Sequence, residues 1–262
     1  RLVGSLASLF ILASHPRCLL CFFSLRLFSS LPHPLPSMTA PKINFRSKSM
    51  LRVGQTLRHG GTFGFKIESQ IYTGPFSDVY IVSQDDGAAP AKKYALKLEH
   101  ICAAARPVLK QDVRLLSSLA GRRGFPELIA AGRTASFKYC VMQLLGPDLA
   151  HLRLCCPLQN FSPSTTLQLA VQTLRLLASL HDVGYICRDF KAANLTIGDG
   201  ADEHNVVYML DFGFARRFRY ENGQLRRQRP SAALLGTMKY APLASHARRE
   251  QTPRDDLESW FY

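Results

Sequence analysis

The chain has 262 residues, of which 47% are hydrophobic and 20% charged, and its formal net charge is +14. This is the composition of a globular protein with one large domain or two lobes, and it excludes a disordered or low-complexity chain. The charge is uneven, because residues 1–60 hold eight basic side chains and no acidic one. The modest basic excess of the remainder suits a solvated face or a phosphate-handling site. Nucleic acid is a weaker third interpretation, because no basic stripe interleaves with aromatic residues.

The cysteines are scattered and odd in number, which indicates reduced thiols. Cys18 and Cys21 form a C-x-x-C, but no second pair or histidine partner follows at metal-ligand spacing. We therefore expect no zinc site. The same usage favours an intracellular protein, which we assign to the cytoplasm, with the nucleus as a further compartment.

Residues 1–50 form an N-terminal extension with several interpretations. Residues 1–36 are apolar and acid-free, but His15, Pro16 and Arg17 interrupt the run, which disfavours a membrane span. A signal peptide and a transit peptide both fit the composition. The chain opens on Arg, however, so we favour translated upstream sequence with a natural start at Met38 or Met50.

Residues 51–145 have the pattern of a small, mostly antiparallel lobe with one helix. The stretch FKIESQIYTGPFSDVYIVSQ (65–84) predicts two strands, because apolar positions alternate around a Gly-Pro turn. Alternation over 92–100 predicts a third strand. A helix is expected over 106–119, and another strand over 137–146.

Residues 146–262 read as a larger, mainly helical lobe. A helix over 162–184 is predicted by Ser, Pro and Thr at its start and a glycine at its end. Its apolar residues recur three and four positions apart: Leu167, Val171, Leu174, Leu177 and Leu180. Two short strands around ANLTI and VVYMLDF follow, joined by a turn. The expected fold class is α+β with two lobes.

Candidate chemical residues fall in four pieces in chain order: a turn with one glycine, a strand lysine followed by a helix acid, the run RDFKAAN, and DFG. The residues are Gly74, Lys97, Asp112, Asp189, Lys191, Asn194 and Asp211. Each piece alone is commonplace, but their joint order is not. The spacing between Asp189 and Asp211 leaves room for a short hairpin that brings both carboxylates to one cleft.

These residue types suit phosphoryl transfer. Lys97, held by an acid, would neutralise phosphate charge. Asp211 and Asn194 offer a carboxylate and an amide carbonyl, the hard oxygen ligands that Mg²⁺ takes. Asp189 would orient a substrate hydroxyl and accept its proton, and Lys191 would neutralise the transferring phosphoryl group.

The chain resembles eukaryotic protein kinases, and among them the casein kinase I group and its tau-tubulin kinase branch. The stretches that carry the resemblance are LRVGQTL, YALKLE, VMQLLGPDL, STTLQLAVQTL, LHDVGYICRDFKAAN, YMLDFGFARRF, GTMKYA and DDLESWFY. KYAPLASH replaces the usual Ala-Pro-Glu motif, as is typical of this group. The resemblance implies a bilobal kinase fold, ATP and Mg as cofactors, and transfer to protein Ser or Thr. It places Ala95, Met142, Gln143, Leu144 and Leu145 around the adenine.

Several residues depart from the family pattern. Tyr72 and Ser77 replace glycines of the Gly-rich loop, so we expect a crowded phosphate roof. Asp112 replaces Glu, and its shorter side chain reaches Lys97 only if the helix moves inward. Cys187 replaces the catalytic-loop His, a packing position. These departures keep open an alternative, a pseudokinase or truncated scaffold that binds partners without phosphorylating them.

Two features remain near the end of the chain. The chain stops at Tyr262, within the expected central helix of the large lobe, so we expect an incomplete lobe with Leu257, Trp260 and Phe261 partly uncovered. A basic cluster precedes GTMKYA: Arg216, Arg217, Arg219, Arg226, Arg227 and Arg229. It suits either a solvated loop or a cradle for acidic or phosphorylated segments of a protein substrate. We expect no nucleic-acid or membrane partner.

Overall fold

A computed structural model describes residues 50–61, 63–74, 77–85, 91–101 and 108–262. The expectations for residues 1–49, including a start at Met38, and for Cys18, Cys21 and Cys102 lie outside the described residues. Within the described ranges, no helix combines the length and the apolar character that crossing a bilayer requires.

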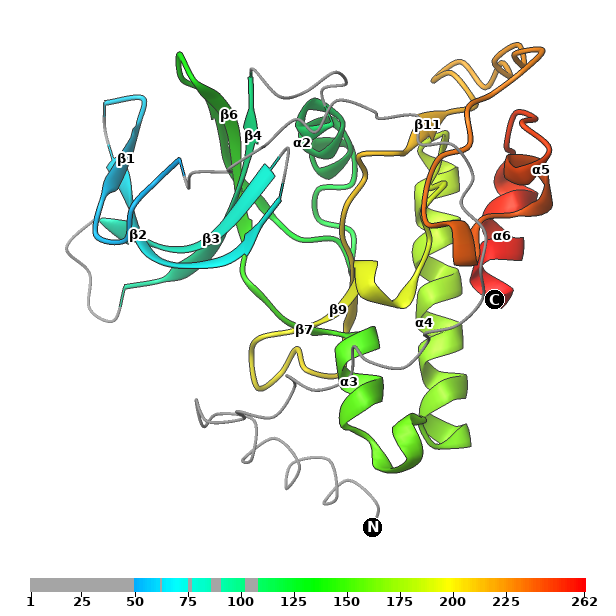
Figure 1. Ribbon diagram of the computed structural model, residues 1–262, viewed down its shortest axis with the longest axis horizontal. Coiled ribbons are helices and arrows are strands. Elements are labelled where there is room, and N and C mark those ends of the chain that lie inside the picture. The colour runs from blue at the N-terminus through cyan, green and yellow to red at the C-terminus, as the bar shows by residue number, and fades with distance from the viewer. Residues whose placement is uncertain (1–49, 62, 75–76, 86–90, 102–107) are drawn as a thin grey trace, which may run out of the picture. The chain divides into compact units, whose positions relative to one another are not determined.

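A six-stranded antiparallel sheet forms the first lobe (Figure 1). Its strands are β1 (Thr56–His59), β2 (Phe63–Thr73), β3 (Ser77–Asp85), β4 (Lys93–His100), β5 (Leu128–Arg133) and β6 (Phe137–Gln143). They lie in the order β1-β2-β3-β4-β6-β5. The pattern predicts β2, β3, β4 and β6 correctly. It misses β1 and β5, whose sequences TLRH and LIAAGR lack a sustained alternation and become strands by pairing with β2 and β6.

Alternation along β4 separates the core from the opposite face of the sheet. Tyr94, Leu96 and Leu98 are buried and pack with residues of neighbouring strands. Ala95 and Lys97 therefore point to the other face, because successive strand residues point to opposite sides. This is the face on which the helix of the lobe lies.

Helix α2 (Leu109–Ser118) packs against β4, β5 and β6. It confirms the helix predicted over 106–119 for the part that the structure describes. Its buried face consists of Leu109, Leu115 and Leu116 together with one acid, Asp112. A buried carboxylate among leucines requires polar partners, and these lie in the cavity described below.

The rest of the described chain contains four α-helices and several short strands, joined by loops. Its helices are α3 (Leu149–Cys155), α4 (Pro163–Asp182), α5 (Leu243–His246) and α6 (Pro253–Phe261). Its short strands are β7 (Leu145–Asp148), β8 (Tyr185–Ile186), β9 (Leu195–Gly198), β10 (Val207–Met209) and β11 (Arg216–Arg217). Strands β9 and β10 pair antiparallel, as the predicted hairpin requires. The chain thus has an α+β, bilobal, protein-kinase-like fold.

Helix α4 begins as its sequence predicts but buries a different face. Ser162 caps it by accepting the Thr165 N–H at 3.1 Å, and a proline follows the cap. Three of the five expected apolar positions, Leu167, Val171 and Leu174, are exposed. The buried residues are Thr173, Leu176, Leu177 and Leu180.

The buried residues of α4 still have helical spacing, but they include Thr173, which a hydrophobicity pattern would not place in the core. Thr173 accepts a hydrogen bond from Trp260 Nε1 of α6 at 2.9 Å, so its hydroxyl is satisfied inside the interface. On α6, Leu257 and Phe261 are exposed, as expected, while Trp260 is partly buried against the core.

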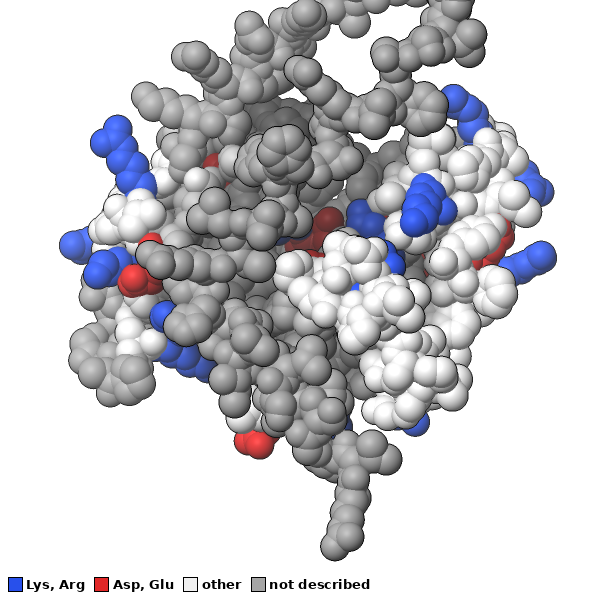
Figure 2. Space-filling view, turned by 60° about the horizontal axis from the view of Figure 1, so that its bottom comes forward, with Lys and Arg blue, Asp and Glu red and all other residues white. Residues whose placement is uncertain are grey.

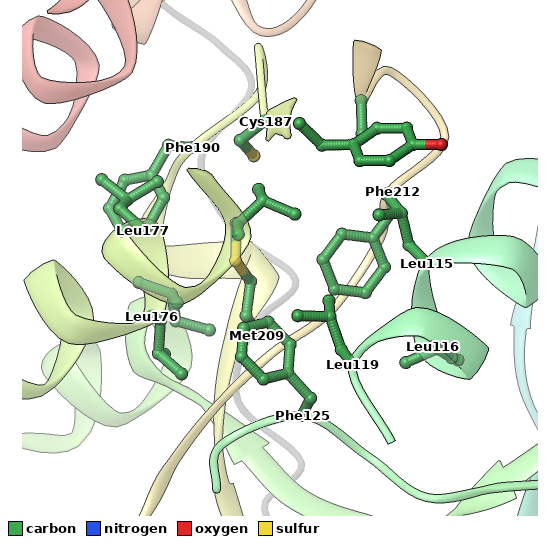
Figure 3. Close-up of a cluster of buried hydrophobic side chains, with 14 of the residues drawn as sticks. Leu115, Leu116, Leu119, Phe125, Leu176, Leu177, Cys187, Phe190, Met209 and Phe212 are labelled. Atoms are coloured by element: carbon green, nitrogen blue, oxygen red, sulfur yellow. The ribbon is translucent and has the colours of Figure 1, made fainter. Parts of the chain in front are cut away.

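A second hydrophobic cluster joins α2 and α4 to the loops between them (Figure 3). Phe212 of the DFG motif lies in it, with its ring centroid 6.1 Å from that of Phe125. Cys187 is buried in the same cluster with Phe190 and Met209. The loops that contain DFG and RDFKAAN therefore pack against one hydrophobic core.

Candidate active site

A cavity of about 500 Å³ contains most of the residues that the sequence singles out. Its lining includes Ala95, Lys97, Asp112, Met142, Gln143, Leu144, Leu145, Asn194 and Asp211. Gly74, Asp189 and Lys191 are not part of this lining. Asp189 is nevertheless in direct contact with Asn194, and Gly74 adjoins Tyr72, which lines the cavity.

Lys97 lies between two carboxylates. Its Nζ is 2.7 Å from Asp112 Oδ2 and 3.3 Å from Asp211 Oδ1. The direct contact with Asp112 shows that α2 lies close enough for the shorter acid to reach. Burial lowers the pKa of Lys97, but the two negative charges outweigh burial, so the net pKa lies above its ordinary value.

The two acids differ in their surroundings. Burial raises the pKa of Asp112, and Lys97 offsets this only in part. Burial also opposes ionisation of Asp211, but Lys97 and the Gly213 N–H outweigh it, so the pKa of Asp211 lies below its usual range. Asp211 is also the more accessible of the two acids, with 41% of its side chain exposed against 3% for Asp112.

Asp112 has a second partner that the sequence does not reveal. Its Oδ1 accepts the backbone N–H of Phe212 at 2.7 Å. The same carboxylate therefore joins the strand lysine to the DFG motif. This contact fixes the position of Asp211, whose φ of 61° is unusual for a residue other than glycine.

Asp189 is held by a compact network. Its Oδ1 accepts the Thr237 N–H at 2.8 Å, and its Oδ2 accepts from Lys191 Nζ at 2.9 Å. Lys191 Nζ also donates to Thr237 Oγ1 at 2.7 Å. Asn194 Nδ2 donates to the Asp189 carbonyl oxygen at 3.0 Å. This network connects RDFKAAN to GTMKYA, although 46 positions separate Lys191 from Thr237.

Asn194 and Asp211 are adjacent because of the β9–β10 hairpin. Leu195 pairs with Met209, and the Leu210 N–H donates to the Asn194 carbonyl at 2.8 Å. The amide group of Asn194 uses its nitrogen on Asp189, which leaves the amide oxygen for a cation. A carboxylate and an amide oxygen at one wall of a cavity suit a hard divalent ion.

Asp256 supports the segment that leads into RDFKAAN, a role that sequence reasoning missed. Its carboxylate is 1% exposed and accepts the backbone N–H groups of Cys187 and Arg188 at 2.7 and 2.9 Å. It also lies 2.8 Å from His181 Nε2. The DDLESWFY motif contains this residue, but nothing in the motif itself points to a buried acceptor.

Cys187 fills its position by packing. Its side chain lies in the cluster of Figure 3, and burial raises the pKa of its thiol well above the ordinary value. A buried, protonated thiol is a small apolar group. The loop therefore keeps its support without the usual histidine.

The residues that the sequence places around adenine line the cavity together. Ala95 on β4 lies opposite Met142 on β6 in the sheet register. Gln143 Nε2 donates to Glu203 Oε2 at 2.9 Å, which ties the end of β6 to the β9–β10 turn. The apolar residues of the wall suit a flat heteroaromatic ring.

The basic cluster is partly neutralised. Arg216 and Arg229 both pair with Glu250, Arg216 Nε at 2.5 Å from Glu250 Oε1. Arg217 stacks over the Tyr185 ring at 5.0 Å and pairs with Glu221. Arg226 and Arg227 are exposed. The predicted cluster therefore combines residues held by the protein with residues open to solvent.

No protein-family model matches the chain. The chain is 47% identical over 217 residues to the serine/threonine-protein kinase spe-6 of Caenorhabditis elegans, which covers 82% of this chain and 56% of that protein. It is 34% identical over 201 residues to a protein of the same organism named "Putative casein kinase I C03C10.2". This match covers 76% of the present chain and 58% of that protein. The chain thus spans little more than half the length of these relatives.

The names of the relatives and the residues of the cavity point to the same class of protein. The matched relatives are serine/threonine-protein kinases, and the site contains a lysine between two carboxylates beside an Asp-Lys-Asn network. The chain is therefore a relative of serine/threonine-protein kinases, with a protein-kinase-like fold.

Proposed function

We propose that this chain is the catalytic part of a serine/threonine-protein kinase that transfers the γ-phosphoryl group of Mg-ATP to protein hydroxyls. The contact that carries the proposal is the ion pair of Lys97 with Asp112 and Asp211 at the wall of one cavity. A volume of about 500 Å³ accommodates a nucleotide. The lining combines these charged groups with apolar residues, among them Ala95 and its sheet neighbour Met142.

The residues present fit a magnesium ion. Asp211 offers an ionised carboxylate, and Asn194 offers its amide oxygen, because its amide nitrogen is committed to Asp189. A bound Mg²⁺ would neutralise phosphate charge. Lys97 would bind phosphate oxygens, and its two carboxylate partners hold its ammonium group at the cavity wall.

Asp189 is the proposed acceptor of the substrate proton. It is only 6% exposed, and three donors hold its carboxylate in one orientation. A seryl or threonyl hydroxyl that hydrogen-bonds to it would be aligned for attack. Lys191, 2.9 Å from Asp189, is placed to stabilise negative charge on the transferring group.

The finer proposal is membership of the casein kinase I group, in its tau-tubulin kinase branch. One relative carries the casein kinase I name. The branch rests on the sequence motifs, among them KYAPLASH in place of Ala-Pro-Glu.

The proposed substrate is a protein segment that is acidic or already phosphorylated. Arg226 and Arg227 are exposed beside the Arg216–Glu250–Arg229 cluster, and a phosphate could exchange with Glu250 as the partner of these guanidinium groups. On the face in Figure 2, the described Lys and Arg side chains are scattered around the margin, and some lie beside acids near the centre. The described residues in this view thus form no single basic patch.

The test is transfer of labelled phosphate from γ-labelled ATP to peptides with a single Ser or Thr, with or without a phosphoserine nearby. We expect label on Ser or Thr in wild type and none in Asp189→Asn. The exposed acid Asp199 offers a matched control, and Asp199→Asn should transfer normally. A purified, ATP-binding chain that labels no peptide would favour the scaffold alternative. Equal rates on peptides with and without the nearby phosphoserine would contradict only the proposed binding of phosphorylated segments by the arginines.

A further inference from the structure

Tyr72 occupies the roof of the cavity at a position where kinases of the resembled family have glycine. It lies near the end of β2 and lines the cavity together with Ser77 and Val79. Two register shifts interrupt the pairing of β2 with β3, the second between Gln70 and Tyr72. Such bulges change the face to which a side chain points. Tyr72 is half exposed, so a ligand in the cavity can reach its ring.

The sheet register places Tyr72 in the same row across the sheet as Lys97. Tyr72 lies opposite Val79 on β3, and Val79 lies opposite Lys97 on β4. These three residues form one row across the sheet, and all three line the cavity. Ala95 and Met142, at the adenine side, belong to a different row, which crosses β3 at Ile81. Tyr72 therefore shares a row with the proposed phosphate-binding lysine and not with the adenine site.

Gly74 provides the space for the Tyr72 ring. A Cβ added to Gly74 would lie 2.6 Å from the Tyr72 hydroxyl oxygen and 2.9 Å from a ring carbon. Any larger residue would therefore push the ring away. The Gly74 N–H donates to the Ser77 carbonyl at 2.9 Å, so this amide is used within the hairpin. The single glycine of the loop that remains thus supports the tyrosine and does not itself offer a free N–H.

We propose that the Tyr72 hydroxyl donates a hydrogen bond to the phosphate chain of the bound nucleotide, and that Gly74 is required because it seats this ring. The inference rests on the proposed function, since it concerns the same nucleotide. A Gly-rich loop binds phosphate through its backbone N–H groups. Here the Tyr72 hydroxyl would supply a neutral hydrogen-bond donor in their place. The interaction is charge-assisted, because the acceptor is a phosphate oxygen.

Equilibrium titration of the full chain with Mg-ATP and with adenosine tests the inference. Tyr72→Phe removes only the hydroxyl, so we expect roughly tenfold weaker ATP binding and unchanged adenosine binding. Tyr220→Phe, at another exposed tyrosine, is the matched control and should bind both like wild type. Thermal melting of each variant verifies folding.

A double-mutant cycle tests the role of Gly74. Gly74→Ala should weaken ATP binding in the wild-type background and have little effect in a Tyr72→Gly background, because no ring then remains to be displaced. Equal loss in both backgrounds would overturn the seating role. Unchanged ATP binding by Tyr72→Phe, or equal weakening of ATP and adenosine, would overturn the phosphate contact while leaving the kinase proposal intact. A wild-type chain that binds no ATP would contradict both.

Discussion

Lys97 and Asp112 are in direct contact, with 2.7 Å between the ammonium nitrogen and one carboxylate oxygen. The other oxygen of Asp112 accepts the Phe212 N–H at 2.7 Å. A single aspartate therefore connects β4, α2 and the DFG motif. The shorter acid does not break the pair, because α2 lies close to the sheet.

We predict that Asp112→Asn lowers the transfer efficiency, kcat/KM, by roughly 10- to 100-fold, since it loses a hydrogen bond to a charged group and the charge that opposes Lys97. Asp112→Glu should not restore full activity, because an added methylene overpacks a site that is 2% exposed. Steady-state kinetics of both variants, with Asp199→Asn as control, check this. Wild-type kinetics in Asp112→Asn would show that the contact is dispensable.

Asp256 should contribute strongly to stability. It is buried and accepts from the backbone N–H groups of Cys187 and Arg188. We expect Asp256→Ala to cost about 3–5 kcal/mol of unfolding free energy, because the donors left behind lose their charged partner. Urea denaturation measures the loss. Asp199→Ala, at an exposed acid, should change stability by less than about 0.5 kcal/mol.

The cysteines should differ in reactivity. Burial raises the pKa of Cys140 to about 12 and that of Cys187 well above its ordinary value, whereas Cys155 is exposed. Iodoacetamide at neutral pH should therefore label Cys155 in the folded chain and leave Cys140 and Cys187 unmodified until denaturant is added. Peptide mass spectrometry gives the extent at each site. Rapid labelling of Cys187 in the folded chain would contradict its place in the core.

Glu250 should make stability depend on pH in the acidic range. Burial opposes its ionisation, but Arg229 and Arg216 outweigh burial and hold the pKa of Glu250 below its ordinary 4.5. A carboxyl with a lowered folded-state pKa stabilises the protein above the unfolded-state pKa, and this stabilisation is lost as the pH falls through the folded-state pKa.

Glu250→Gln should therefore be less stable than wild type at neutral pH, and the difference should shrink below about pH 5. Urea denaturation of both proteins between pH 7 and pH 3 measures this. A difference that stays constant over the whole range would mean that the Arg216–Glu250–Arg229 contact does not stabilise the folded chain.

The sequence predicts those parts of the fold in which local pattern and tertiary environment agree. β4 alternates, and α4 carries its own N-terminal cap, so both are found at the expected places. The buried face of α4 is not predictable from hydrophobicity, because Thr173 is buried by a partner, Trp260, that is 87 positions away. β5 likewise depends on pairing with β6.

In the candidate site, too, local arrangements are predictable from the sequence and long-range contacts are not. Motif spacing predicts that Asn194 and Asp211 lie close together, because the β9–β10 hairpin that joins them is local. The contact of Asp112 with Phe212 and the support of Arg188 by Asp256 each join residues far apart in the chain. Neither has a sequence signal, since a carboxylate on a helix looks the same whether it is solvated or buried.

Magnesium-dependent binding of ATP tests most directly whether these residues form one working site. The measurement is the melting temperature of the chain with ATP, with and without Mg²⁺, in wild type and in Asp211→Asn. With ATP at a hundred times its dissociation constant, we predict about 2.7 kcal/mol of stabilisation in wild type, with its magnesium-dependent part lost in Asp211→Asn. A wild-type chain that melts cooperatively but shows no shift with Mg-ATP would contradict the assignment.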